Sequence, residues 1–378
     1  MRLTPMSEYQ YYEFQALDRS LTAAEREKLS AISSRAKITA RSAAFNYSYS
    51  DLDSNFLALL ERHFDVAYYI ANWGTQQLAF RFPAGLLSPE EVDLYCLEDV
   101  VEVIHKKDNW ILNWNFNQEE GFSFWIEGEG RVDALVDLRR ELLAGDYRPL
   151  YLAWLKGIQI LEEEDKDNLP EPPIPCGLQK LSVAQKAFVE LFEVDPYLLS
   201  AAAQLSQPLG AASAPSSKTL RQAVAKLSRS DCDNFLVQIL QGEENIGAQL
   251  RKKLHPHLPS ADQPVPSQRT SGQLLEFSRQ AKEAEERRAK EAAYKEKVKS
   301  LQALASREPK LWDEVDTLLL ESKPQNYNRA VTILSQLRDL AEYQKTLPEF
   351  QRRMTKISQR YPNRRSLIAK FKEARLIS

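Results

Sequence analysis

The sequence has 378 residues, of which 43% are hydrophobic and 10% aromatic, so wholesale disorder is excluded and real cores are expected. At about 150 residues per domain, this length predicts two to three domains. Three cysteines lie far apart with no CxxC pair, which argues against a disulfide framework and a structural zinc site and favours a reducing cytoplasm. Neither an apolar N-terminal stretch nor a run of about 18 apolar residues is present, so we expect no signal peptide and no membrane partner.

Charge is divided unevenly along the chain, although the formal net charge is only −3. Residues 270–378 carry 23 Lys/Arg and 15 Asp/Glu, a net of +8, which leaves −11 for residues 1–269. The last 29 residues, Phe350 to Ser378, hold nine basic side chains and one acid, Glu373. This asymmetry is typical of a surface for nucleic acid or an acidic protein, and a solvated helical end is the plain alternative.

Strand and helix signals alternate in the first part of the chain. Strands are predicted at 9–16, 43–49, 67–73 and 77–82, the last two forming a hairpin around Gly74-Thr75. Helices are predicted from Thr22, where Thr22 and Glu25 have capping-box spacing, at 52–64 and, briefly, after Ser88. The order β-α-β-α-β-β predicts an α+β N-terminal domain with an antiparallel or mixed sheet.

An aromatic stretch then alternates with asparagine. Period two places Trp110, Leu112, Trp114 and Phe116 on one face of a strand and Asn113 and its neighbours on the other. The tryptophans, with Trp73 and Trp125, either close the core or form a stacking platform, and the alternation favours the core. Strands are also predicted at 100–104 and 122–126, followed by helices at 132–143 and 148–161.

Two Pro-rich stretches, 162–176 and 255–268, predict breaks between parts of the chain. Between them, helix starts are expected at Ser182 and Asp195, with further helices at 220–227 and 234–240. We therefore divide the chain into an α+β domain (1–165), a helical domain (166–258), a linker (259–271), a long charged helix (272–306) and a short helical bundle with a basic C-terminus (307–378). The region after the α+β domain is thus expected to be all-α.

The long charged helix carries Glu–Lys and Glu–Arg pairs at i,i+4 and is expected to stand in water as a spacer of about 50 Å. A coiled coil is the competing interpretation, although Arg288, Glu291 and Lys295 interrupt its apolar seam. After it, segments 311–320 and 327–337 predict one helical hairpin.

Two segments resemble known families. Residues 11–19 (YYEFQALDR), together with 71–75 (ANWGT), resemble a family of uncharacterised bacterial proteins over roughly residues 8–200. Residues 311–376, with 327–331 (YNRAV) and 337–341 (LRDLA), are similar to the helical region of some bacterial proteins that also carry a SWIM-type zinc finger. The zinc finger's CxC and CxH pairs are absent, so the second resemblance implies no metal site.

No catalytic, cofactor-binding or metal-binding motif is recognisable. The sequence contains no GxSxG, P-loop or GxGxxG, and its paired acids lie at predicted helix starts or in linkers. We therefore expect no cofactor and no enzymatic activity, although an active site assembled only by folding stays an alternative.

The basic C-terminus is the sharpest functional signal. On a helix, Arg352, Arg353, Lys356 and Arg360 share one arc, opposite an apolar face of Phe350, Met354, Ile357 and Tyr361. The predicted phosphate or acidic-partner contacts are Arg352, Arg353, Lys356, Arg360, Arg364, Arg365, Lys370 and Lys372. The first hypothesis is a non-enzymatic adaptor with a protein partner in an intracellular assembly, and the alternative is sequence-independent binding of nucleic acid.

Overall fold

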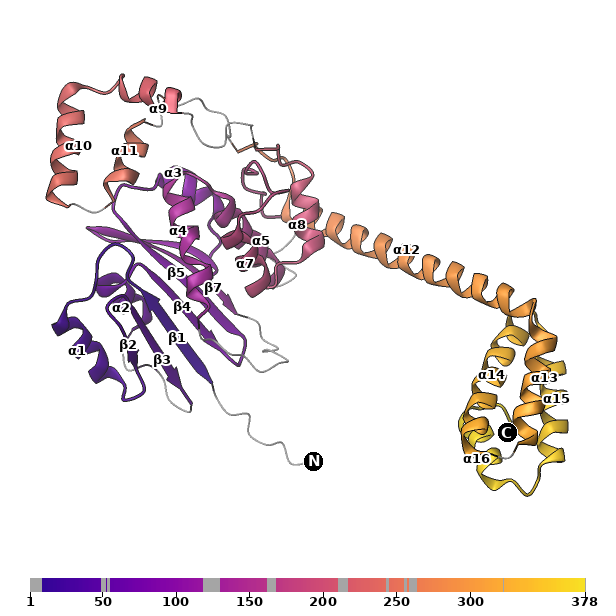
Figure 1. The fold of residues 1–378 in the computed structure, drawn as a ribbon. Helices are drawn as coiled ribbons and strands as arrows, with labels where there is room; N and C mark the ends of the chain where they lie inside the picture. Colours follow the sequence, from indigo (N-terminus) through magenta and orange to yellow (C-terminus); the bar gives the residue numbers. More distant parts are fainter. Residues whose placement is uncertain are drawn as a thin grey trace. The chain divides into compact units, whose positions relative to one another are not determined.

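A computed structural model describes residues 9–48, 52, 55–117, 130–161, 168–209, 217–242, 245–254, 257, 264–321 and 323–377. The chain divides into two compact units, Met1–Lys282 and Glu283–Ser378. The first contains a sheet with helices and the second is helical, so the predicted α+β domain followed by an all-α region is confirmed (Figure 1).

Seven antiparallel strands form one sheet in the order β2-β3-β1-β4-β5-β7-β6. They are β1 (Gln10–Gln15), β2 (Lys37–Ile38), β3 (Ser42–Tyr47), β4 (Val66–Ala71), β5 (Thr75–Pro83), β6 (Val101–His105) and β7 (Asn109–Asn117). The predicted β4–β5 hairpin is confirmed, and Gly74 at its turn has a φ of +107°, which favours glycine. The predicted strand at 122–126 lies outside the described residues.

Helices cover both faces of the sheet. On one face, side chains such as Tyr68, Phe80 and Trp114 pack against α4 (Val136–Leu143), α5 (Arg148–Ile160) and α7 (Val183–Leu191). On the other, Phe14 and Phe45 pack against α1 (Ala23–Ile32) and α2 (Phe56–His63). The 132–143 segment differs from its prediction, because a short 3-10 turn, η2 (Val132–Ala134), precedes α4.

The aromatic strand β7 follows its predicted alternation only in part. Leu112, Trp114 and Phe116 are buried on one face, but Ile111 is buried on the other face. Asn113 is also buried, where it accepts a hydrogen bond from the Gln77 amide, so the asparagine side of β7 is not a free surface. Trp114 belongs to the core as expected, Trp73 is 41% exposed, and Trp125 lies outside the described residues.

Local capping signals set several helix starts. The capping boxes at Thr22 and Ser182 are both formed, and the Asp195 side chain accepts from two backbone N–H groups at the start of α8 (Pro196–Ala203). A short α3 (Pro89–Val92), continued by η1 (Asp93–Tyr95), follows Ser88 as predicted. Three more helices follow among the described residues of this part: α9 (Ser217–Val224), α10 (Arg229–Gln241) and α11 (Ile246–Leu254).

The two Pro-rich segments meet in the N-terminal unit. Ile174 exchanges backbone hydrogen bonds with Val265, and Glu171 N–H donates to the Arg269 carbonyl. The buried Glu171 carboxylate also accepts from Arg269, Ser267 and Tyr151 side chains. These bonds fasten the chain just before α12 (Ser271–Ala305), whose Leu274 is buried in the same core.

The C-terminal unit contains the rest of α12 and four further helices: α13 (Glu308–Leu320), α14 (Pro324–Tyr343), α15 (Leu347–Arg360) and α16 (Arg365–Glu373). The predicted hairpin of α13 and α14 is confirmed. The C-terminal unit has a separate hydrophobic core, which includes Trp312, Val315, Leu334 and Met354.

Candidate nucleic-acid interface

Helix α15 packs by one face and exposes the other. Phe350, Met354 and Ile357 follow each other at intervals of four and three residues and are buried against α13 and α14. A helix with this spacing must turn its remaining positions to solvent. Sequence periodicity therefore predicted the packing face of α15 correctly.

The exposed side of α15 carries four cations: Arg352, Arg353, Lys356 and Arg360. At 100° per residue they lie within an arc of about 100°. None forms an ion pair with a carboxylate among the residues that the structure describes, although Glu349 lies on the same helix. Glu349, Arg352, Arg353, Thr355 and Lys356 line a shallow hollow of about 540 Å³. We call the four cations the α15 basic surface.

An aromatic contact holds one of these cations in place. The Arg353 guanidinium lies 4.0 Å from the centre of the Trp312 ring, and Trp312 is itself buried beside Phe350. Stacking on a ring uses the flat face of a guanidinium and leaves its N–H edge available for a phosphate oxygen. Sequence reasoning missed Trp312, because its partner lies on another helix 41 residues away and only tertiary packing joins them.

Arg364 makes contacts inside the C-terminal unit. It lies between α15 and α16, where its guanidinium donates to the Leu319 carbonyl and stacks over the Tyr361 ring at 4.4 Å. It therefore links the helices of the C-terminal unit. Such a link does not require an external anion.

The three remaining predicted cations are all on α16. Arg365 and Lys372 are exposed, and helical spacing puts them on one face, whereas Lys370 is half-buried and points elsewhere. Leu367 and Phe371 anchor α16 in the core. The structure thus brings together the four α15 cations, and Arg365 and Lys372 form a separate pair on α16.

Among the residues that the structure describes, no group of three or more His, Cys, Asp or Glu is arranged to hold a metal ion. No helix among these residues has the length and apolar character needed to cross a membrane. Comparisons with protein-family models, curated proteins and solved structures found no match to this chain, so both sequence resemblances stay predictions.

Proposed function

We propose that this chain is a non-catalytic binding protein whose C-terminal unit binds nucleic acid through backbone phosphates, without reading the base sequence. The α15 basic surface carries this proposal, because it gathers exposed cations that no described carboxylate neutralises. Contacts between Arg or Lys and phosphates supply most sequence-independent affinity for nucleic acid.

The composition of the surface favours nucleic acid over an acidic protein. The centres of protein–protein interfaces are depleted of charged residues and enriched in large apolar ones. In the described part of the C-terminal unit, the large apolar side chains with high exposure are Tyr294, Leu320 and Tyr343, and none is on α15. A cationic surface without an apolar centre is suited to a phosphate backbone.

The direct test is fluorescence anisotropy of the full chain with labelled single-stranded and duplex oligonucleotides of two unrelated sequences at several salt concentrations. We expect the same affinity for both sequences and a steep loss with salt. Replacing Arg352, Lys356 and Arg360 with alanine should lower the slope of log affinity against log salt by about three for duplex DNA. Arg353 is kept because it packs on Trp312.

The matched control removes the same charge from another exposed place. Arg287, Lys290 and Lys295 on α12 are all exposed, and their triple alanine variant should bind nucleic acid almost as wild type. An equal loss in both triple variants would mean that net charge alone matters and would contradict the proposal. Unchanged binding in the α15 variant would contradict it as well.

A specific observation favours a second function, binding of a protein partner by the N-terminal unit. Helix α10 has no buried residue, and Leu236, Val237, Ile239 and Leu240 are each half or more exposed on its last two turns. Segment 217–254 carries seven Lys/Arg and four Asp/Glu. A partner helix with one apolar face and acidic flanks would complement the exposed apolar side chains of α10 and the excess of Lys and Arg around them.

The test compares wild type with the Leu236→Glu/Leu240→Glu variant. A partner protein that binds wild type should not bind the variant. Calorimetry with the purified partner and each form of the chain measures the loss of affinity. Gln241→Glu, on the same exposed helix, serves as the control. Equal affinity of the partner for wild type and the double variant would exclude α10 as its binding site.

A further inference from the structure

A second charged region lies in the N-terminal unit and is independent of the α15 basic surface. It is a cavity of about 640 Å³ where the end of β1, α4 and α11 meet. That volume lies in the range of small-molecule sites. Its charged lining consists of Arg41, Arg139, Arg140, Arg251, Asp18 and Asp133.

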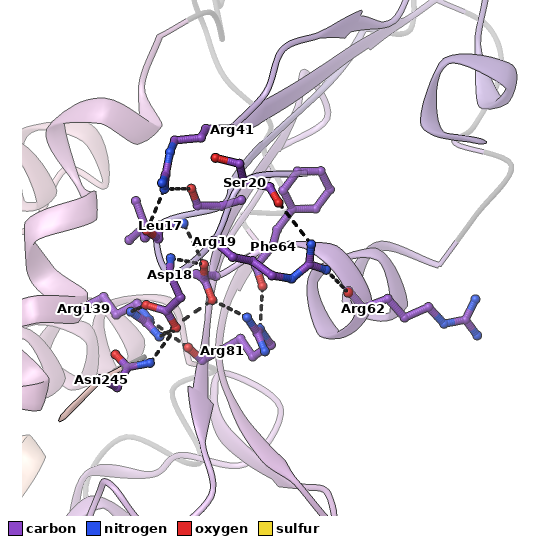
Figure 2. A network of polar contacts seen from close by, with 12 residues as sticks. Leu17, Asp18, Arg19, Ser20, Arg41, Arg62, Phe64, Arg81, Arg139 and Asn245 are labelled. Carbon is purple, nitrogen blue, oxygen red and sulfur yellow. Dashed lines mark hydrogen bonds and ion pairs between the residues drawn. The ribbon is translucent and has the colours of Figure 1, made fainter. Parts of the chain in front are cut away.

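The floor of this cavity is a fixed ion-pair network (Figure 2). The two terminal nitrogens of Arg139 donate to the two oxygens of Asp18 at 2.9 and 2.7 Å, and its Nε donates to the Arg81 carbonyl. The buried Asp65 accepts from the backbone N–H groups of Leu17 and Asp18 and from the Arg81 side chain. Because these groups satisfy one another, the floor is rigid and nearly neutral.

Cations remain in excess on the walls. Arg41 uses one terminal nitrogen to donate to the carbonyls of Ala16 and Leu17 (Figure 2). Arg251 is exposed and forms no ion pair with any described carboxylate. Arg139 is paired with Asp18 and Arg140 with Asp137, so Arg41 and Arg251 are the lining arginines that no described carboxylate neutralises.

The N-terminus of α11 also faces this cavity. Asn245, which directly precedes α11, donates from its side chain to Asp18 at 2.9 Å and ties the helix start to the floor. The first N–H groups of a helix have no partner inside the helix and favour anions. Gly247, in the first turn, lines the cavity, and a Cβ built on it would meet no atom within 4 Å. Backbone donors and open space therefore lie beside the arginines.

We propose that this cavity binds the phosphate group of a small molecule between Arg41, Arg251 and the first turn of α11. A phosphate dianion would supply the negative charge that Arg41 and Arg251 lack among the described carboxylates. The remaining volume leaves room for an organic part attached to the phosphate. The site does not depend on the proposed function of the C-terminal unit.

The experiment uses the full chain, with inorganic phosphate and pyrophosphate as probes in calorimetry and thermal unfolding, against chloride at equal ionic strength. We expect saturable binding and a rise in unfolding temperature that chloride does not give. Arg251→Ala should weaken binding at least tenfold, and Gly247→Asp should abolish it by placing a carboxylate in the open space. Lys28→Ala, an exposed cation on α1, should change nothing.

Three results would overturn the proposal. One is phosphate stabilising the chain no more than chloride does. Another is equal affinity of wild type, Arg251→Ala and Gly247→Asp. The third is loss of phosphate binding in the variant lacking Arg352, Lys356 and Arg360, which would place the anion on the C-terminal unit instead.

Discussion

Two arginines, one in each unit, show opposite roles of this side chain: Arg139 in the N-terminal unit and Arg353 in the C-terminal unit. In the N-terminal unit, Arg139 and Arg269 are largely buried, and each forms a two-pronged contact with one carboxylate, Asp18 or Glu171. In the C-terminal unit, Arg353 stacks on a tryptophan ring and keeps its charge at the surface. The same side chain therefore serves as internal structure where a carboxylate faces it. Arg353, which the Trp312 ring supports and no described carboxylate faces, remains available to a ligand.

The largest effect that would sharpen this comparison is expected for Arg139→Ala. The change leaves Asp18 buried without its main cation, and breaking a buried pair in this way costs about 3–5 kcal/mol of unfolding free energy. Urea denaturation measures the loss. Arg140→Ala, one residue along the same helix but 80% exposed, should stay within about 0.5 kcal/mol of wild type. A small loss for Arg139→Ala would mean that the pair is not a structural element.

A smaller effect is expected on the free energy of unfolding at acidic pH. Burial alone would raise the pKa of Asp18, but hydrogen bonds and charge from Arg139 outweigh it and hold that pKa below its usual value. The folded state therefore binds fewer protons than the unfolded state near this pKa. The stabilisation is fully present above the unfolded pKa of about 3.9 and is lost as pH falls through the folded pKa.

The measurement is the slope of unfolding free energy against pH between about 5 and 2.5, where Asp18→Asn should be flatter than wild type. Asp137→Asn, the same substitution at a carboxylate that is 58% exposed, is the control. Parallel curves for wild type and Asp18→Asn would contradict the assignment.

The smallest effect concerns the C-terminal unit. Arg353→Ala removes a guanidinium from the face of Trp312, which costs about 0.5–1 kcal/mol at a partly exposed site. Arg352→Ala, whose side chain has no such ring contact among the described residues, should leave stability unchanged within error. A loss above about 2 kcal/mol for Arg353→Ala would make it a structural residue and erase the contrast between the units.

Sequence reasoning succeeded where the signal is local. The caps at Thr22 and Ser182 each depend on a residue three positions away, and the buried face of α15 follows from helical period alone. The fold class followed from the same kind of pattern.

It failed where two distant segments determine the outcome. Glu171 and Arg269 are 98 residues apart, and Asp18 and Arg139 are 121 apart. In the sequence each is one charged residue among many. The cavity beside α11 was therefore not predicted, whereas the α15 basic surface was, because its residues lie on one helix.

The position of β1 inside the sheet has a consequence for synthesis. β1 is translated before the other six strands of this sheet, yet it lies between β3 and β4 and needs both to complete its backbone hydrogen bonds. During synthesis, both neighbouring strands, β3 and β4, are available to β1 only after Ala71, the last residue of β4, has left the ribosome. During that interval the nascent chain exposes an unpaired strand with three aromatic side chains, which is the kind of segment that chaperones shield.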